Sequence, residues 1–217
     1  MKELKDNYRE KRINLINELR RHEELDPNVL DAMLTIKREF FMNPIHASRA
    51  YDDSALPIDC NQTISQPYTV AFMTSLLKIE QSMKTLEIGT GSGYQSAVLV
   101  ALGARVHTIE RHRQLHENAK KRFEELGLQI MTSCGDGTLG WKLYSPYQRI
   151  IVTAAAPNIP EKLKLQLAVG GRLVVPVGDK DTQKMYLIER ISESNFRETP
   201  KQFFKFVPLI GADGWKE

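Results

Sequence analysis

Acidic and glycine residues follow three consecutive hydrophobic runs, in positions where strands could present them to a ligand. Residues 87–93 read Glu-Ile-Gly-Thr-Gly-Ser-Gly, Glu110 ends the second run, and Gly-Asp-Gly at 135–137 follows the third. Glycines in such a turn let the backbone bend tightly and approach a ligand closely. A carboxylate about 20 residues further on can hold both hydroxyls of a ribose. The third acid and its neighbouring amide can read the edge of an adenine.

Two details separate this pattern from a dinucleotide site. Tyr94 stands where the GxGxxG fingerprint has its final glycine, and Glu87 suits a ligand with a positive group better than a pyrophosphate. The pattern resembles the S-adenosylmethionine site of class I methyltransferases. That resemblance implies cofactor contacts from Glu87, Gly89, Gly91, Gly93, Glu110, Asp136 and Gly137. The alternative is an α/β domain without a nucleotide, whose acids are solvated at strand ends.

The elements that must position these residues alternate between strands and helices. Short β-like runs occur at 85–88, 106–109, 129–132, 149–152 and 173–177, and the helical patterns between them at 94–101, 112–126 and 160–167. This alternation predicts a parallel sheet with helices on both faces. Runs at 184–189 and 203–209 have no helix between them, which indicates an antiparallel edge. We therefore predict an α/β fold with a doubly wound, mostly parallel, Rossmann-like sheet, an antiparallel edge and extra N-terminal helices.

The segment before this alternation predicts helices and one long loop. Apolar residues from Leu4 to Leu19 recur at helical spacing, and Asp26 followed by Pro27 is a typical helix start. The periodicity fades between 40 and 65, and loops this long are usually functional. A third helix opens at Ser65-Gln66-Pro67 and runs to about Lys78. We expect one domain, residues 1–217, with N-terminal helices and the active-site loop at 1–80, a cofactor-binding core at 81–180 and edge strands at 181–217.

Composition limits the classes of partner. The chain has 217 residues, 41% of them hydrophobic and 26% charged, and a net charge of +3. These values are typical of a soluble globular protein, and the charge is too small to indicate nucleic acid. No apolar run is long enough for a membrane span or signal peptide, and Cys60 and Cys134 lack metal-site spacing. We expect a cytoplasmic protein with reduced thiols, no membrane or nucleic-acid partner and no metal; a monomer is favoured, although the sequence leaves the oligomeric state open.

Longer motifs point to one family of methyltransferases. In chain order they are Leu-Pro at 56–57, Gln-Thr-Ile-Ser-Gln-Pro-Tyr at 62–68, the glycine turn, Gly-Asp-Gly at 135–137, Val-Thr-Ala-Ala-Ala-Pro at 152–157, Gly-Gly-Arg-Leu-Val-Val-Pro-Val-Gly at 170–178, Val-Pro-Leu-Ile-Gly at 207–211 and Trp215. From about Leu25 to Trp215 the chain resembles the protein-L-isoaspartate O-methyltransferases. The Gln-Thr-Ile-Ser-Gln-Pro run is the most specific motif, since general methyltransferases lack it.

The resemblance implies an activity and a site. Such enzymes methylate the free carboxylate of L-isoaspartyl residues in damaged proteins, with S-adenosyl-L-methionine as donor and S-adenosyl-L-homocysteine as product. The ester then closes to a succinimide that reopens partly to aspartate. Ser65 matches the family's active-site serine and is expected to hydrogen-bond the substrate carboxylate. The resemblance also implies that the cofactor contacts Gln62, Thr63, Ile64 and Ser65.

Several alternatives stay open at this point. Ser65 could simply cap the helix that starts at Pro67. Asn61 stands where the family usually has glycine, and asparagine tolerates left-handed backbone. His112 and His116 have the spacing of a two-histidine metal face but lack a third ligand, so we expect a solvated helix surface. Other readings of the whole chain are a class I methyltransferase with another acceptor and an adaptor that binds without turnover.

Overall fold

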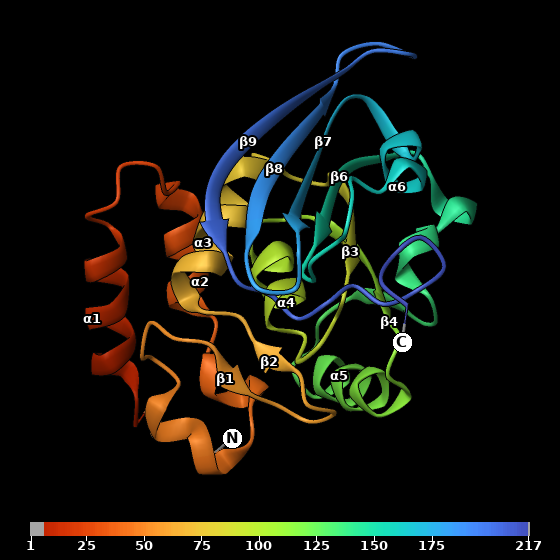
Figure 1. Cartoon of the computed structure of the whole chain (residues 1–217). Coiled ribbons are helices and arrows are strands. Elements are labelled where there is room, and N and C mark those ends of the chain that lie inside the picture. Colours follow the sequence, from red (N-terminus) through yellow and green to blue (C-terminus); the bar gives the residue numbers. More distant parts are fainter. Residues whose placement is uncertain (1–6, 217) are drawn as a thin grey trace.

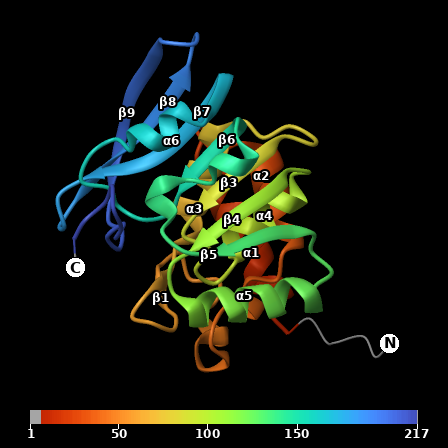
Figure 2. The same ribbon diagram turned by 90° about the vertical axis from the view of Figure 1, so that its right-hand side faces the viewer.

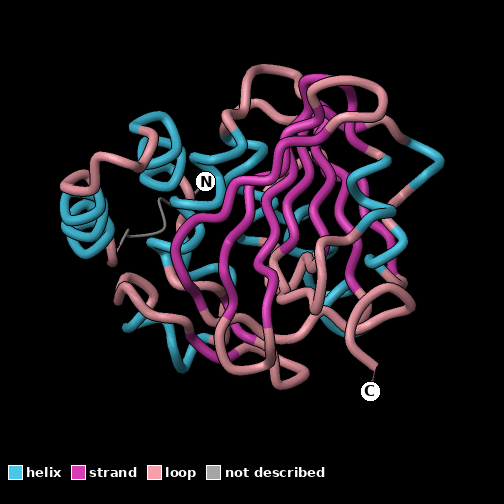
Figure 3. The backbone as a smooth tube through the Cα atoms, turned by 45° about the horizontal axis from the view of Figure 1, so that its top comes forward, coloured by secondary structure: helices cyan, strands magenta, loops and turns pink. Residues whose placement is uncertain are grey.

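The computed structural model describes residues 7–216 and is organised around one twisted sheet of seven strands (Figures 1 and 3). The strands are β3 (Lys84–Ile88), β4 (Arg105–Glu110), β5 (Ile130–Cys134), β6 (Tyr147–Val152), β7 (Leu167–Gly178), β8 (Gln183–Arg190) and β9 (Phe196–Phe204). Their order in the sheet is β5-β4-β3-β6-β7-β8-β9. The first five pair in parallel, and β8 pairs antiparallel with both β7 and β9. The predicted fold class is confirmed.

Helices cover both faces of this sheet. They are α1 (Arg9–Leu19), α2 (Pro27–Thr35), α3 (Pro67–Leu77), α4 (Tyr94–Ala101), α5 (Arg113–Glu125) and α6 (Glu161–Leu165). In Figure 1, α1, α2 and α3 lie to the left of the sheet and α6 lies to the right, and Figure 2 shows the same arrangement turned by 90°. One hydrophobic core joins α1 to α4 with Ile151, Val174 and Met185 of the sheet. A second core includes Ile150, Leu173 and, from α6, Leu163.

The segment between α2 and α3 is irregular, as its fading periodicity predicts. It contains the 3-10 turns η1 (Arg38–Phe41) and η2 (Pro44–Arg49) and a small antiparallel hairpin of β1 (Leu56–Pro57) and β2 (Thr63–Ile64). The predicted start of α2 is confirmed, because Asp26 accepts a hydrogen bond from the Asn28 amide at 3.0 Å. The expected contribution of Leu4 to the first helix falls outside the described residues.

Two boundaries differ from the sequence-based expectation. The helix expected at 160–167 ends at Leu165, and Gly170 lies inside β7 with a positive φ of 79°. Residues 168–171 form a bulge there, since Tyr147 pairs with Leu167 and Arg149 pairs with Arg172. A glycine pair after a helical pattern therefore marks an irregular strand, not a helix end.

The last strand also differs from expectation. The apolar run 203–209 predicts a strand, but β9 is Phe196–Phe204 and residues 205–209 leave the sheet. Residues 205–209 are joined to the rest of the fold by an isolated bridge between Ala155 and Pro208 and by a hydrogen bond from the Phe206 amide to the Gln183 side chain at 2.8 Å. The apolar residues 207–209 of this run line a cleft, as described below.

Strand order reverses at β3, which pairs with β4 on one side and with β6 on the other. In open parallel sheets of this kind, ligands bind in the crevice at the carboxyl ends of the strands beside such a reversal. The fold therefore indicates a ligand site among the loops after β3, β4 and β6. Among residues 7–216, no helix has the length and apolar character that crossing a membrane requires.

Candidate active site

A cleft lies at the carboxyl ends of β3, β4 and β6. Three separate parts of the chain line it: residues 62–65 before α3, the loops that follow the three strands, and residues 207–210. The cleft has about 910 Å³ of empty space, its open mouth included. Apolar lining comes from Ile88, Ile109 and Leu209.

The glycine turn after β3 forms one wall of the cleft. Gly89 and Gly91 line it with positive φ angles of 93° and 53°. A Cβ atom on Gly89 would lie 2.5 Å from the Thr153 hydroxyl, which donates hydrogen bonds to the carbonyls of Ile88 and Gly89. Gly93 is the N-cap of α4 and does not line the cleft. Its φ of 86° and the Phe123 ring 2.5 Å from a hypothetical Cβ give it a structural reason to be glycine.

Glu110 lines the cleft at the end of β4, and its carboxylate holds the glycine turn in place. One oxygen accepts a hydrogen bond from the Gly91 amide at 2.8 Å, and the other accepts from the His112 amide at 2.9 Å. Each carboxylate oxygen can accept a second hydrogen bond. Glu110 can therefore bind two further donors, such as a pair of ribose hydroxyls.

The segment 62–65 supplies another wall, so Gln62, Thr63, Ile64 and Ser65 all reach the cleft. Ser65 does not cap α3, whose N-cap is Gln66; the Tyr68 amide instead donates to the Asp53 carboxylate at 2.8 Å. The capping alternative is therefore wrong. No described residue forms a hydrogen bond with the Ser65 hydroxyl, which leaves it available to a ligand.

Asn61 precedes this segment with a φ of 55°, and Cys60 has a φ of 58°. Both belong to the left-handed region, which a glycine adopts without strain and an asparagine tolerates. The backbone shape at this turn explains why asparagine can replace the glycine usual in the family that the sequence resembles.

Glu87, like Gly93, is a predicted cofactor residue that does not line the cleft. Its side chain is 0% exposed and accepts hydrogen bonds from the hydroxyls of Ser96 and Thr108. Its other oxygen, Oε1, has no partner. Burial raises the pKa of Glu87 to about 8, although both hydrogen bonds act in the opposite direction. In this structure Glu87 joins β3 to β4 and α4 beneath the glycine turn.

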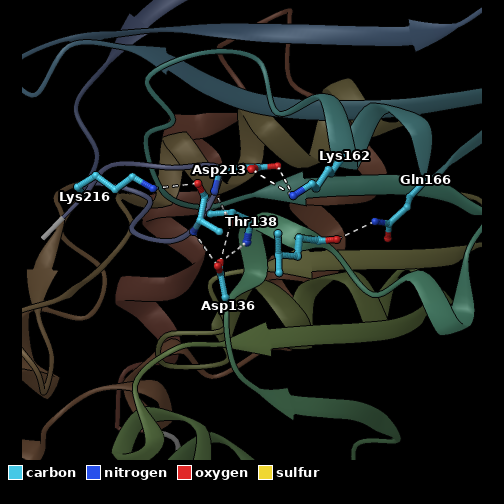
Figure 4. Close-up of polar contacts among 8 residues, drawn as sticks. Asp136, Thr138, Lys162, Gln166, Asp213 and Lys216 are labelled. Carbon is cyan, nitrogen blue, oxygen red and sulfur yellow. Dashed lines mark hydrogen bonds and ion pairs between the residues drawn. The ribbon is translucent and has the colours of Figure 1, made fainter.

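Asp136 does not line the cleft either, and both of its carboxylate oxygens accept hydrogen bonds from the protein (Figure 4). One oxygen accepts from the amide and the hydroxyl of Thr138, and the other accepts from the Ala212 amide at 2.7 Å. These hydrogen bonds hold the pKa of Asp136 below its ordinary value despite partial burial. Its neighbour Gly137 does line the cleft, and a Cβ there would lie 2.5 Å from Ile88.

The C-terminal segment therefore connects directly to the loop that carries Asp136. Asp213 donates its amide to the Thr138 hydroxyl and forms an ion pair with Lys162 at 3.0 Å (Figure 4). The Trp215 indole donates to the Ala155 carbonyl at 3.1 Å. Residues 207–210 immediately precede this segment and line the cleft. The segment fixes that wall.

Sequence reasoning missed several residues of the cleft. Tyr94, Gln95 and Thr153 line it, and so does His112, which is half-buried and not fully solvated as expected. His116 is also half-buried and lies 3.2 Å from the Thr132 hydroxyl. A helix N-terminus at a strand end is a signal that could have placed His112 correctly. The described residues bring no three histidine, cysteine or acidic side chains together as a metal site would need.

Comparison with known proteins identifies the family. A family model described as protein-L-isoaspartate(D-aspartate) O-methyltransferase matches residues 10–214. The chain belongs to this family. A protein-L-isoaspartate O-methyltransferase from Cytophaga hutchinsonii is 48% identical, over 98% of this chain and 97% of its own. The enzyme of that name from Chlorobaculum tepidum is 50% identical, over 95% of this chain and 97% of its own.

Solved structures agree with this membership of the protein-L-isoaspartate methyltransferase family. A protein-L-isoaspartate O-methyltransferase with 30% identity superposes with a TM-score of 0.83, over 93% of this chain and 66% of its own. A Plasmodium falciparum protein in complex with S-adenosyl-L-homocysteine has a TM-score of 0.78 at 21% identity, over 91% of this chain and 97% of its own. At that identity the second comparison bears on the fold alone.

Proposed function

We propose that this protein transfers a methyl group from S-adenosylmethionine to the free carboxylate of L-isoaspartyl residues in proteins. The observation that carries the proposal is the placement of Gln62–Ser65, the most family-specific stretch of the sequence, on the same cleft as the glycine turn and Glu110. Family membership across residues 10–214 supports it as well. The other two readings, a different acceptor and an adaptor without turnover, have no observation in their favour.

The cleft suits the cofactor. When bound, S-adenosylmethionine supplies a methyl group on a positively charged sulfonium. Glu110 offers free acceptor positions for ribose hydroxyls, and Gly89 and Gly91 bring the backbone of the turn to the cleft. We assign cofactor contacts also to Gln62, Thr63, Ile64, Ser65 and Gly137. Glu87, Gly93 and Asp136 instead support the loops that line the site.

For this reaction the protein mainly has to position the carboxylate and the methyl group. An isoaspartyl carboxylate is ionised at neutral pH, so no general base has to remove a proton. We assign to Ser65 a hydrogen bond from its hydroxyl to that carboxylate, which would hold one oxygen in line with the methyl group. In-line transfer gains most of its rate from such positioning in a site sheltered from water.

We also propose that three stretches of one domain have different roles. Residues 1–80 would supply the helices and active-site loop, 81–180 the cofactor-binding core, and 181–217 the edge strands and the far wall of the cleft. We further propose a cytoplasmic monomer that does not bind nucleic acid. The small net charge of +3 and the two unpaired cysteines support this assignment.

The test is methyl transfer from labelled S-adenosylmethionine to an isoaspartyl peptide and to its aspartyl twin. The two peptides differ by one methylene in the position of the carboxylate, and misplacement by about 1 Å can cost on the order of a hundredfold in rate. We expect a preference of at least that size for the isoaspartyl peptide. Comparable rates on both peptides would contradict the repair function and leave a less selective carboxyl methyltransferase.

The Ser65→Ala variant tests the assignment of the serine in the same assay. Turnover on the isoaspartyl peptide should fall by more than the affinity for S-adenosylmethionine falls. The melting temperature should stay close to wild type, because Ser65 does not cap α3. Normal turnover would remove Ser65 from the substrate site.

A further inference from the structure

Arg38 is a buried cation that the site has not yet explained. Its side chain is 0% exposed, at the start of η1. Nε donates to the Ala50 carbonyl at 2.9 Å, Nη2 donates to the Ser65 carbonyl at 2.8 Å, and Nη1 is buried without a partner. The guanidinium also lies over the Tyr94 ring, 4.9 Å from its centroid. A guanidinium in such a place is costly unless something compensates its charge.

No described carboxylate forms an ion pair with Arg38. The acids nearest to its surroundings are already occupied: Asp53 is exposed and accepts from the Tyr68 amide and the Gln66 side chain, and Glu39 accepts from the Tyr51 hydroxyl. Burial lowers the pKa of Arg38 to about 10, so the side chain is still charged at neutral pH. Within the described part of the chain, its positive charge is therefore only weakly compensated.

This charge lies directly behind the wall of the cleft. Two of its partners, the Ser65 backbone and the Tyr94 ring, belong to residues that line the cleft. A carboxylate bonded to the Ser65 hydroxyl would be separated from the guanidinium only by Ser65, whose carbonyl accepts from Arg38. In these buried surroundings water screens the attraction between the two charges little. The missing counter-charge is thus close to the place where an anionic substrate is expected.

We propose that Arg38 is a positioning residue that fixes the backbone of Ser65 and attracts the substrate carboxylate into the cleft with its buried charge. The proposal rests on the proposed function, because it assumes that the acceptor is a carboxylate at Ser65. It adds a reason for the enzyme to distinguish substrate from product. Methyl transfer turns the carboxylate into a neutral ester, so the attraction to Arg38 ends when the reaction is complete.

This difference predicts a particular kinetic effect. The attraction acts fully on the ionised substrate and only partly on the transition state, where the carboxylate has lost much of its charge. Removing the charge of Arg38 should therefore raise KM for the isoaspartyl peptide, and the loss of this attraction should not by itself lower kcat. Arg38→Met removes the charge and keeps an unbranched side chain, whereas Arg38→Lys keeps the charge and loses the planar group. We expect KM to rise about tenfold in the first and much less in the second.

Arg149→Met is the matched control. Arg149 is also a buried arginine that donates only to backbone carbonyls, those of Lys78 and Gln148, and it lies at the amino end of β6, the opposite end from the cleft. Both Met variants should lower the melting temperature, but only Arg38→Met should change KM for the peptide. Affinity for S-adenosylmethionine, measured by calorimetry, should stay near wild type in all three variants.

Two peptide ligands distinguish an effect of the Arg38 charge from an effect of impaired folding. We would compare two peptides that the enzyme cannot turn over quickly: the methyl ester product and the isoasparaginyl peptide, whose free carboxylate is replaced by a neutral carboxamide. Wild type should bind the isoaspartyl peptide more tightly than either, and Arg38→Met should lose most of that preference. An unchanged preference in Arg38→Met would overturn the proposal. Failure of wild type to methylate the isoaspartyl peptide would instead overturn the proposed function.

Discussion

Two carboxylates beside the glycine turn, Glu87 and Glu110, show how position within a strand decides a residue's role. Glu87 pairs with Thr108 in the parallel register, two residues before Glu110. Both side chains therefore point to the same side of the sheet, but Glu110 is at the strand end and reaches the cleft, whereas Glu87 is deeper and buried. The sequence alone does not give this register, which is why it predicts both acids as cofactor ligands.

The prediction at this scale concerns Glu110. Glu110→Ala should weaken S-adenosylmethionine binding by roughly 1–3 kcal/mol, since charge-assisted hydrogen bonds to the ligand are lost and the Gly91 amide loses its acceptor. Titration calorimetry on the folded variant measures this directly. Glu117→Ala, which removes an exposed acid from α5, is the control and should bind as wild type does. Equal affinities in the two variants would take Glu110 out of the site.

Individual strands were predictable from the sequence where they are buried, because a buried strand consists mostly of apolar residues. Strands β3 and β4 are buried, and their apolar runs place them within two residues of the structure. Strand β9 lies at the sheet edge with mostly polar, partly exposed residues such as Arg197 and Glu198, so it leaves no apolar signal. The apolar run that follows it covers the cleft instead. An apolar run in a sequence indicates that its residues are buried. It does not show whether they are buried in a strand or in the wall of a cleft.

The prediction for elements concerns the contact between the loop after β5 and the C-terminal segment. Asp136→Ala should free the segment 211–216, because the Ala212 amide loses its acceptor and the Thr138 hydroxyl loses the group that orients it. Losing such a contact costs about 1–3 kcal/mol locally, so the amides of Ala212 and Asp213 should exchange with solvent roughly 10–100-fold faster.

Asp179→Ala provides the comparison for that experiment. Asp179 also accepts hydrogen bonds from two backbone amides, those of Asp181 and Thr182, but it lies in the turn between β7 and β8. Its loss should leave exchange at residues 212 and 213 unchanged. Protection that survives in Asp136→Ala would show that Lys162 and Trp215 hold the segment without help from the loop.

For the molecule as a whole, the sheet and its antiparallel edge were predictable, and so was the location of the cleft. Alternation of strands and helices predicts the doubly wound sheet, and the glycine turn and the acids after its strands predict the edge where a ligand binds. The contacts between distant segments were not predictable. They include the hydrogen bonds from Arg38 to the Ser65 carbonyl, from the Tyr68 amide to Asp53 and from the Thr153 hydroxyl to the Gly89 carbonyl. No local pattern encodes these pairings.

The prediction at this scale is a pH dependence of global stability. The pKa of Glu87 rises from the ordinary 4.5 to about 8 on folding. Between these values the folded state holds a proton that the unfolded state releases, so the free energy of unfolding should fall as pH rises from 4.5 to 8. Glu87→Gln should lose this contribution and be more stable than wild type at pH 9 by at least about 1 kcal/mol. Denaturant unfolding at several pH values measures the difference, with Glu117→Gln as control. Parallel curves for wild type and Glu87→Gln would contradict the assignment.

The walls of the cleft come from residues 62–65, the strand-end loops, and residues 207–210, which are far apart along the chain. A ribosome makes them in that order. A nascent chain that has already folded its glycine turn still lacks the last wall, because residues 207–210 and the segment that anchors them have not yet been made. Translation therefore delays completion of the site until residues 207–210 have left the ribosome. A polypeptide interrupted before residue 207 carries the glycine turn without the enclosure that the reaction needs.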